Sequence, residues 1–305
     1  MNVKLMKRLC KYTQKNAIIY LGRFLKKYYE NVKVTNRFII AEGTIPICLV
    51  AHLDTVFPNP PSEIYFDEEQ NVMWSPDGLG ADDRAGVYAI VRLIQMGHRP
   101  HIVLTTDEEI GGIGARALID VFPECPFQEC NFLIELDRQG EQDCVFYRCA
   151  NELFEDKICD YGFVTAFGTF SDISIIAPQW GIAAVNLSIG YIDEHSRVER
   201  LHLDWTEATI EKVSMMFTDA MEEESSFSYA YVEAPMPAAD WSWWVPNQTN
   251  ETFATNTHCL ICTKKLGEHP NKIMTNTDYF YVCDDCYKQY YEDDCPTPTD
   301  DSLIF

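Results

Sequence analysis

The chain has 305 residues, and 47% of them are apolar, which is enough to bury a full hydrophobic core and leave a smaller second module. Its net charge is −23, so nucleic-acid phosphates would be repelled over most of its surface, and we expect no nucleic-acid partner. No apolar run approaches the length of a membrane span, and the N-terminus does not resemble a signal peptide, so we expect a cytoplasmic protein with no membrane attachment.

Apolar runs alternate with helical repeats along the first two thirds of the chain. This order predicts an α/β fold, with a mixed and mostly parallel sheet flanked by helices. The segment 56–76 is rich in proline and is expected to be mostly loop with a short hairpin. Strands are expected at 32–35, 38–41, 45–50, 101–105, 131–136 and 182–189, and helices at 1–30, 84–96, 111–121, 151–160, after 172, and beyond a capping residue at Thr206.

The N-terminal segment is strongly basic. Residues 1–37 hold ten Lys or Arg against one acid, Glu30. A helix with a solvated basic face is the plainer interpretation, and a patch for a partner or a membrane is the alternative.

Composition changes near residue 224, where we expect the catalytic domain to end. The segment 225–256 is interpreted as a linker whose Trp241, Trp243 and Trp244 pack against one domain, and a partner-binding patch is the alternative. The residues 291–305 are acidic and contain proline, so we expect them to be disordered. The predicted domains are 1–224, 225–256, 257–290 and 291–305.

Acid and imidazole side chains follow successive apolar runs, at first about thirty residues apart, which is the length of one strand–helix–strand unit. Because the carboxyl ends of parallel strands meet at one edge of a sheet, these side chains can converge there. Two imidazoles with three carboxylates suit a centre of two divalent metal ions. The predicted ligands are His52, Asp82, Glu109, Asp137 and His195.

Two cations close together need a bridging carboxylate that relieves their repulsion, and we assign Asp82 to this place. His52 and Asp137 are then expected on one zinc ion, with Glu109 and His195 on the other. Co²⁺ or Mn²⁺ could replace zinc in the cell.

Glu108 is the predicted general base. It adjoins Glu109, and two adjacent carboxylates cannot face one metal in the same way, so Glu108 stays free. We expect it to take a proton from the attacking water and pass it to a leaving amine, while the two cations polarise the substrate carbonyl. These features predict metal-assisted hydrolysis of an amide bond.

Five segments resemble, in order, the motifs of zinc-dependent exopeptidases with a co-catalytic dimetal centre, a superfamily of aminopeptidases, tripeptidases, carboxypeptidases and deacylases. The resemblance covers about residues 45–205 and implies the same ligands and base. It also implies that Asp54 orients the first histidine ligand. The segments are AHLDT at 51–55, GADDRAG at 80–86, TDEEIG at 106–111, ELD at 135–137 and HSRVE at 195–199.

The chain departs from this pattern in two places. The interval 138–194 is too short for an inserted lid domain, so the resemblance implies a single-domain form that lacks lid-borne groups for a substrate carboxylate. Where those families often have Gly-Gly-Thr-Asp, this chain has GTFSD at 168–172, and Asp172 is expected either to contact the site or to cap a helix. Arg138 is expected to bind a substrate carboxylate or to form a salt bridge.

Two Cys-x-x-Cys pairs separated by twenty residues predict a zinc-ribbon-like module at 257–290 with one structural zinc ion. Such a short segment cannot bury a core, so the metal would supply its folding energy. His258 or His269 could replace one thiolate. The other cysteines, from Cys10 to Cys159, are expected to be free thiols in a reducing compartment. The predicted zinc ligands are Cys259, Cys262, Cys283 and Cys286.

Together these features predict a metallopeptidase, most simply an aminopeptidase-like exopeptidase that takes a peptide with a free α-amine. The alternative within enzymes is a deacylase or amidohydrolase acting on an N-acyl amino acid. An alternative of another class is a catalytically inactive scaffold that binds a protein partner through the C-terminal module.

Overall fold

A computed structural model describes residues 2–149, 151–222, 226–231, 271–274 and 279–282 of the chain. The chain divides into two compact units, Met1–Pro235 and Met236–Phe305. In the second unit, β13 (Asn271–Met274) pairs antiparallel with β14 (Tyr279–Val282). The predicted zinc-binding cysteines and the tryptophans of the predicted linker lie outside the described residues, as does the tail 291–305; these are Cys259, Cys262, Cys283, Cys286, Trp241, Trp243 and Trp244.

An eight-stranded mixed sheet forms the centre of the first unit, in the order β1-β2-β6-β3-β7-β10-β8-β9. Its four central strands, β6, β3, β7 and β10, run parallel, while the pairs β1–β2, β2–β6 and β10–β8 are antiparallel. The predicted fold class is therefore confirmed. The strands are β1 (Val32–Val34), β2 (Phe38–Ala41), β3 (Ile45–His52), β6 (Pro100–Thr105), β7 (Phe132–Arg138), β8 (Asp143–Val145), β9 (Val164–Thr165) and β10 (Ala184–Ser188).

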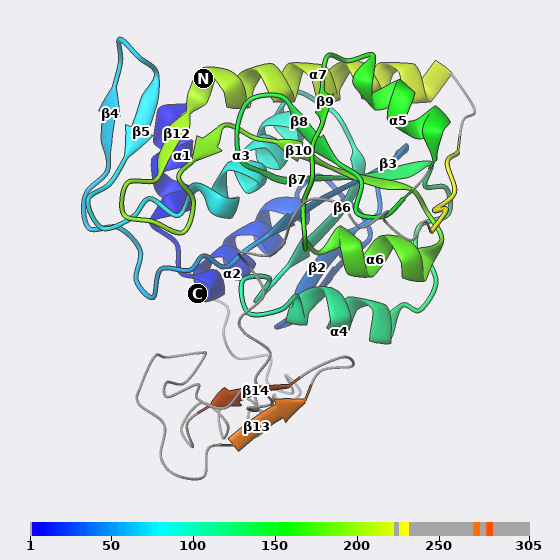
Figure 1. Cartoon of the computed structure of the whole chain (residues 1–305), viewed down its shortest axis with the longest axis horizontal. Helices are drawn as coiled ribbons and strands as arrows, with labels where there is room; N and C mark the ends of the chain where they lie inside the picture. The colour runs from blue at the N-terminus through cyan, green and yellow to red at the C-terminus, as the bar shows by residue number, and fades with distance from the viewer. Residues whose placement is uncertain (1, 150, 223–225, 232–270, 275–278, 283–305) are drawn as a thin grey trace, which may run out of the picture. The chain divides into compact units, whose positions relative to one another are not determined.

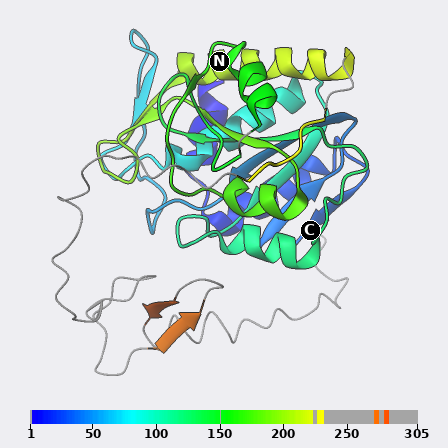
Figure 2. The ribbon, with the colours of Figure 1, turned by 45° about the vertical axis from the view of Figure 1, so that its right-hand side comes forward.

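Helices cover both faces of this sheet, because its central strands are apolar on both sides (Figure 1). One buried cluster joins the sheet to α1, α2, α3 and α7, and a second joins the other face to α4 and α6. The rotated view shows helices on both sides of the sheet (Figure 2). None of the described helices is long and apolar enough to span a membrane. The helices are α1 (Val3–Cys10), α2 (Gln14–Leu25), α3 (Ala81–Gln95), α4 (Ile113–Val121), α5 (Glu152–Cys159), α6 (Ile173–Trp180) and α7 (Leu203–Glu222).

A smaller antiparallel sheet, in the order β11-β12-β5-β4, includes the hairpin expected within 56–76. The loop between β11 and β12 carries His195. Between Asp137 and His195, the described residues add β8, β9 and β10 to the central sheet and form no separate lid. The strands are β4 (Tyr65–Asp67), β5 (Val72–Trp74), β11 (Tyr191–Ile192) and β12 (Arg200–His202).

The prediction that Thr206 caps the last helix is wrong. Helix α7 begins at Leu203, directly after β12. The Thr206 hydroxyl instead donates to the carbonyl oxygens of Ile189 (2.8 Å) and His202 (3.2 Å), so it ties the first turn of α7 to the end of β10.

The first unit continues past residue 224. Among the described residues 226–231, the ring of Phe227 packs against Phe132 and Phe154, with ring centroids 6.0 and 5.2 Å apart. Ser228 pairs with Ile182 in an isolated antiparallel bridge. All seven cysteines in the described part of the chain are free thiols, as expected: Cys10, Cys48, Cys125, Cys130, Cys144, Cys149 and Cys159.

His101 on β6 makes stability depend on pH. Its imidazole lies against the carbonyl oxygen of Glu129 (2.6 Å) and stacks on Phe127, and its burial lowers the pKa below the ordinary 6.5. As the pH falls below 6.5, the unfolded chain therefore binds more protons than the folded chain, and stability is lost. We expect His101→Asn to show a smaller drop in Tm than the wild type between about pH 7.5 and about pH 5.5. An equal drop in thermal unfolding scans of both proteins would contradict this.

Candidate metal centre

The strand order brings the predicted ligands to one edge of the central sheet. The neighbouring parallel strands β6, β3 and β7 end there, with His52 as the last residue of β3 and Asp137 one residue before the end of β7 (Figure 1). The acidic turn with Glu108 and Glu109 follows β6. The start of α3 adds Asp82 to the same edge.

The five predicted ligands form two groups that share Asp82. In the first group, His52 Nε2 lies 2.9 Å from Asp82 Oδ1 and 3.4 Å from Asp137 Oδ1. In the second group, His195 Nε2 lies 3.0 Å from Asp82 Oδ2 and 3.0 Å from Glu109 Oε2. The two oxygens of one carboxylate thus face two separate imidazole–carboxylate pairs.

Asp54 fixes the His52 imidazole and the acidic turn together. Its Oδ1 lies 3.2 Å from His52 Nδ1, on the ring side opposite Asp82. The same carboxylate accepts the backbone N–H groups of Glu108 and Glu109, each at 3.1 Å. One side chain therefore sets the position of an imidazole and of two further carboxylates.

We expect Asp54→Asn to weaken metal binding by about 10- to 100-fold, because an amide has one acceptor oxygen where three donors are now satisfied. Metal affinity should be measured by competition with a chelator of known affinity. Asp67→Asn, on the exposed hairpin, serves as the matched control. Equal affinities of the Asp54 variant and the wild type would show that this carboxylate does not support the site.

Burial and mutual repulsion shift the pKa values of the ligand carboxyls. Burial opposes ionisation of Asp82, but its contacts with His195 and His52 outweigh this and hold its pKa well below the ordinary range. Burial and the charge of Asp82 raise the pKa of Asp137 to about 7, and burial also raises the pKa of Glu109. The pKa of His195 is raised to about 11 by its contacts with Asp82 and Glu109. Of the three ligand carboxyls, Asp82 is therefore the one whose ionised form is stabilised by both imidazoles.

Glu108 is 9% exposed and stands apart from both ligand groups, with no ion pair recorded within 4.0 Å in the described residues. Burial raises its pKa to about 10, since the charge of His52 offsets the desolvation only in part. Two bound cations would favour its ionised form, and a buried carboxylate of raised proton affinity beside them is suited to take up a proton and release it later.

Two acids that were not predicted as site residues hold the backbone around Asp82. Both oxygens of Glu199 accept backbone N–H groups, from Gly80 at 2.6 Å and from Asp82 at 3.1 Å. Asp83 accepts the backbone N–H groups of His52 (3.2 Å) and Gly86 (2.9 Å). Both acids lie inside segments that resemble the exopeptidase motifs, so the motifs themselves were the signal that could have identified them.

Asn186 on β10 holds Asp137. Its side chain accepts the backbone N–H of Asp137 at 2.9 Å and donates to the carbonyl oxygen of the same residue at 3.0 Å. The Tyr191 hydroxyl donates to Asp137 Oδ1 at 3.1 Å. No motif marks either residue, and only the pairing of β10 with β7 shows their role.

Asp172 and Arg138 each had two interpretations. Asp172 occupies the N-cap position of α6, as one interpretation had it, but its side chain makes no capping bond. Its Oδ2 accepts the Thr105 hydroxyl instead, while Oδ1 is buried without a partner. Arg138 donates to Asp143 at 3.3 Å, which is the predicted salt bridge.

The donor set fits divalent cations. Ligand atoms of His52, Asp82 and Glu109 lie within 4.8 Å of one another, and so do those of His52, Asp83 and Asp137. Glu109 Oε1 is buried without a hydrogen-bond partner, so one ligand oxygen remains available. We prefer Asp82 to Asp83 as a ligand, because both oxygens of Asp83 already accept backbone N–H groups.

Comparison with solved structures identifies the same fold in peptidases. A tripeptidase from Staphylococcus aureus superposes with a TM-score of 0.59 at 14% identity, over 72% of this chain and 98% of the other. The aminopeptidase PepT from Bacillus cereus gives 0.55 at 15% identity, over 72% and 98%. A TET aminopeptidase from a marine sediment archaeon of the Thaumarchaeota gives 0.55 at 14%, with the same coverage. No protein-family model and no curated protein matches the sequence.

The structure is therefore an α/β protein that shares its fold with these peptidases and carries a carboxylate-rich candidate metal centre. The fold implied by the sequence motifs is thus confirmed. At these identities the likeness concerns the fold, and the chemistry must be argued from the residues of this chain.

Proposed function

We propose that this protein is a dimetal-dependent metallopeptidase, an aminopeptidase-like exopeptidase that hydrolyses the amide bond next to a free α-amine. The observation that carries the proposal is the Asp82 carboxylate, whose two oxygens lie 2.9 and 3.0 Å from the imidazole nitrogens of His52 and His195. Each imidazole also contacts a second carboxylate, that of Asp137 or of Glu109. His52 and Asp137 would hold one zinc ion, and Glu109 and His195 the other, with Co²⁺ or Mn²⁺ as substitutes.

When bound, two such cations lower the pKa of water and polarise a carbonyl oxygen. Glu108 then holds the proton taken from water and delivers it to the leaving amine, a task that suits its burial beside the ligands. Asp54 holds the His52 ring and the backbone of Glu108 and Glu109 in fixed positions relative to one another during this transfer. Asn186 and Tyr191 hold Asp137 in place.

The charge of the site supports a substrate with a free α-amine. The edge of the sheet carries a surplus of carboxylates, and a carboxylate beside the ligands can bind an ammonium group. The described residues between Asp137 and His195 add no lid that could grip a substrate carboxylate. Peptides are therefore proposed as substrates, in keeping with the names of the neighbours of known structure.

For the C-terminal unit we propose one structural zinc ion on Cys259, Cys262, Cys283 and Cys286, in a module that binds a protein partner or recruits substrate. A cytoplasmic location is proposed because the described cysteines are all free thiols. The limits 257–290 for this module are part of the same proposal.

A library of short peptides, half with free and half with acetylated N-termini, tests the function. Incubation of the zinc-loaded full chain should release N-terminal residues from the free peptides only, as followed by mass spectrometry. Cleavage of free and acetylated peptides alike would show that the substrate needs no free α-amine. Release of acyl groups alone would identify a deacylase. No cleavage by protein that has bound its metals would favour the scaffold interpretation.

A further inference from the structure

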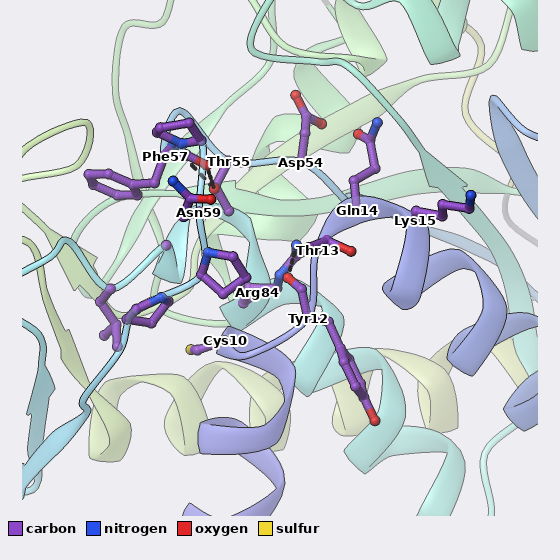
Figure 3. A pocket seen from close by; sticks show the side chains of 15 residues that line it. Cys10, Tyr12, Thr13, Gln14, Lys15, Asp54, Thr55, Phe57, Asn59 and Arg84 are labelled. Atoms are coloured by element: carbon purple, nitrogen blue, oxygen red, sulfur yellow. Dashed lines mark hydrogen bonds between the residues drawn. The ribbon is translucent and has the colours of Figure 1, made fainter. Parts of the chain in front are cut away.

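A pocket of about 340 Å³ adjoins the metal centre at Asp54 but contains none of the proposed metal ligands and not the proposed base. Its walls come from the α1–α2 junction at residues 10–15, the loop at residues 54–61 after β3, and the start of α3 at residues 79–84. Figure 3 shows Arg84 between the segment that carries Tyr12 and the loop that carries Thr55 and Asn59. A pocket of this size can hold a molecule as large as an amino acid.

Arg84 gives the pocket a buried positive charge. Its side chain is 3% exposed, and its guanidinium donates to the carbonyl oxygens of Leu53 and of Tyr12, the latter at 3.0 Å. Nε is buried without a partner, and within the described residues no carboxylate lies within 4.0 Å of the group. A guanidinium has five N–H donors and seldom lies buried without an acid, so an anionic partner would stabilise it.

The acids closest to this charge are already satisfied by other groups. Asp54 accepts from the Glu108 and Glu109 backbone and contacts the His52 ring. Asp83 accepts two backbone N–H groups. Neither acid makes a hydrogen bond to Arg84, so the guanidinium is not held by an acid of the described protein.

The rest of the pocket suits a short apolar group. Its apolar lining includes Phe57, Pro58, Pro60, Pro61 and Leu79, while Thr13, Thr55 and Asn59 add neutral polar groups and Lys15 a second cation. Its one lining acid, Asp54, already contacts the His52 ring and accepts two backbone N–H groups. An anion with an apolar body matches this combination of charge and surface.

We propose that this pocket is a second ligand site, distinct from the metal centre, which binds a small carboxylate with an apolar side chain through Arg84. Free apolar amino acids and their N-acyl derivatives belong to this chemical class. The proposal does not depend on hydrolysis, because the pocket and its guanidinium do not involve the metal ligands.

Calorimetric titration of the full chain in the presence of excess chelator tests it, since metal coordination and turnover are then both removed. N-acetyl-leucine is the probe, and N-acetyl-leucinamide is its neutral counterpart. The acid should bind at least about tenfold more tightly than the amide, because only the acid can pair with the guanidinium. Arg84→Gln should abolish the binding of the acid.

Arg84 also donates to two backbone carbonyls, so Arg84→Gln could lose binding simply because it folds poorly. A second variant that keeps Arg84 is therefore needed. Asn59→Trp, on the exposed loop, should fill the pocket and abolish binding, whereas Gln128→Trp, exposed and outside the pocket, should leave binding unchanged. Equal binding of acid and amide, no binding at all, or unchanged binding in Asn59→Trp would each overturn the proposal. None of these results bears on peptide cleavage, which is measured with metals present.

Discussion

Asp82→Ala should abolish hydrolysis, with a loss of at least ~1,000-fold, and should remove metal from both positions of the centre. The side chain is shared: each of its oxygens lies within 3.0 Å of one imidazole nitrogen. Its removal leaves each group with a single carboxylate and leaves the two cations without a bridge. Mass spectrometry of metal content should show about three zinc ions per chain in the wild type and about one in the variant, since the proposed C-terminal site keeps its own ion.

Asp120→Ala is the matched control, because Asp120 is exposed on α4 and is not among the residues that form the described site. This variant should keep the activity and the metal content of the wild type. If Asp82→Ala retained all of its metal, Asp82 would not be a ligand, and the assignment of the two groups would fail.

Glu108→Gln should lower kcat by about 100- to 10,000-fold while the metal content stays at the wild-type level. The amide keeps the size of the carboxyl but cannot carry a proton between water and the leaving amine. The separation of effects follows from position, since Glu108 lies outside both ligand groups. Steady-state kinetics on the best peptide of the library, with metal analysis of the same sample, give both readouts.

Glu152→Gln, on the exposed first turn of α5, controls for the loss of one charge. A Glu108→Gln enzyme that turned over at the wild-type rate would assign the proton transfer to another group. A variant that lost metal as well as activity would make Glu108 a ligand rather than a base.

The central sheet could be predicted from the sequence because its strands are buried on both faces and therefore appear as continuous apolar runs. The convergence of the candidate ligands could be predicted for the same reason. His52 and Asp137 end or interrupt such apolar runs, and the acidic turn follows the strand β6. Strands β8 and β9 were not predicted. They have only three and two residues, so they show no periodicity of their own.

Residues that act through tertiary contacts could not be predicted in this way. Asn186 holds Asp137 only because β10 lies next to β7, forty-nine residues away along the chain. The start of α7 was misplaced because the Thr206 hydroxyl donates to the carbonyl oxygens of Ile189 and His202 and accepts no N–H group of the helix as a cap would. Nothing in the sequence around Arg84 predicts that its guanidinium is buried without an acid beside it.

The two halves of the metal centre differ in how firmly the protein holds them. His52 is fully buried at the end of a central strand, whereas the His195 side chain is 53% exposed on the loop between β11 and β12, with a backbone φ of 60°. The half around His52 is complete once the large sheet has formed, but the other half is complete only when the small sheet brings its loop into place. The two ions should therefore load in order and with unequal affinity, so that scarce zinc yields a half-filled enzyme before an empty one.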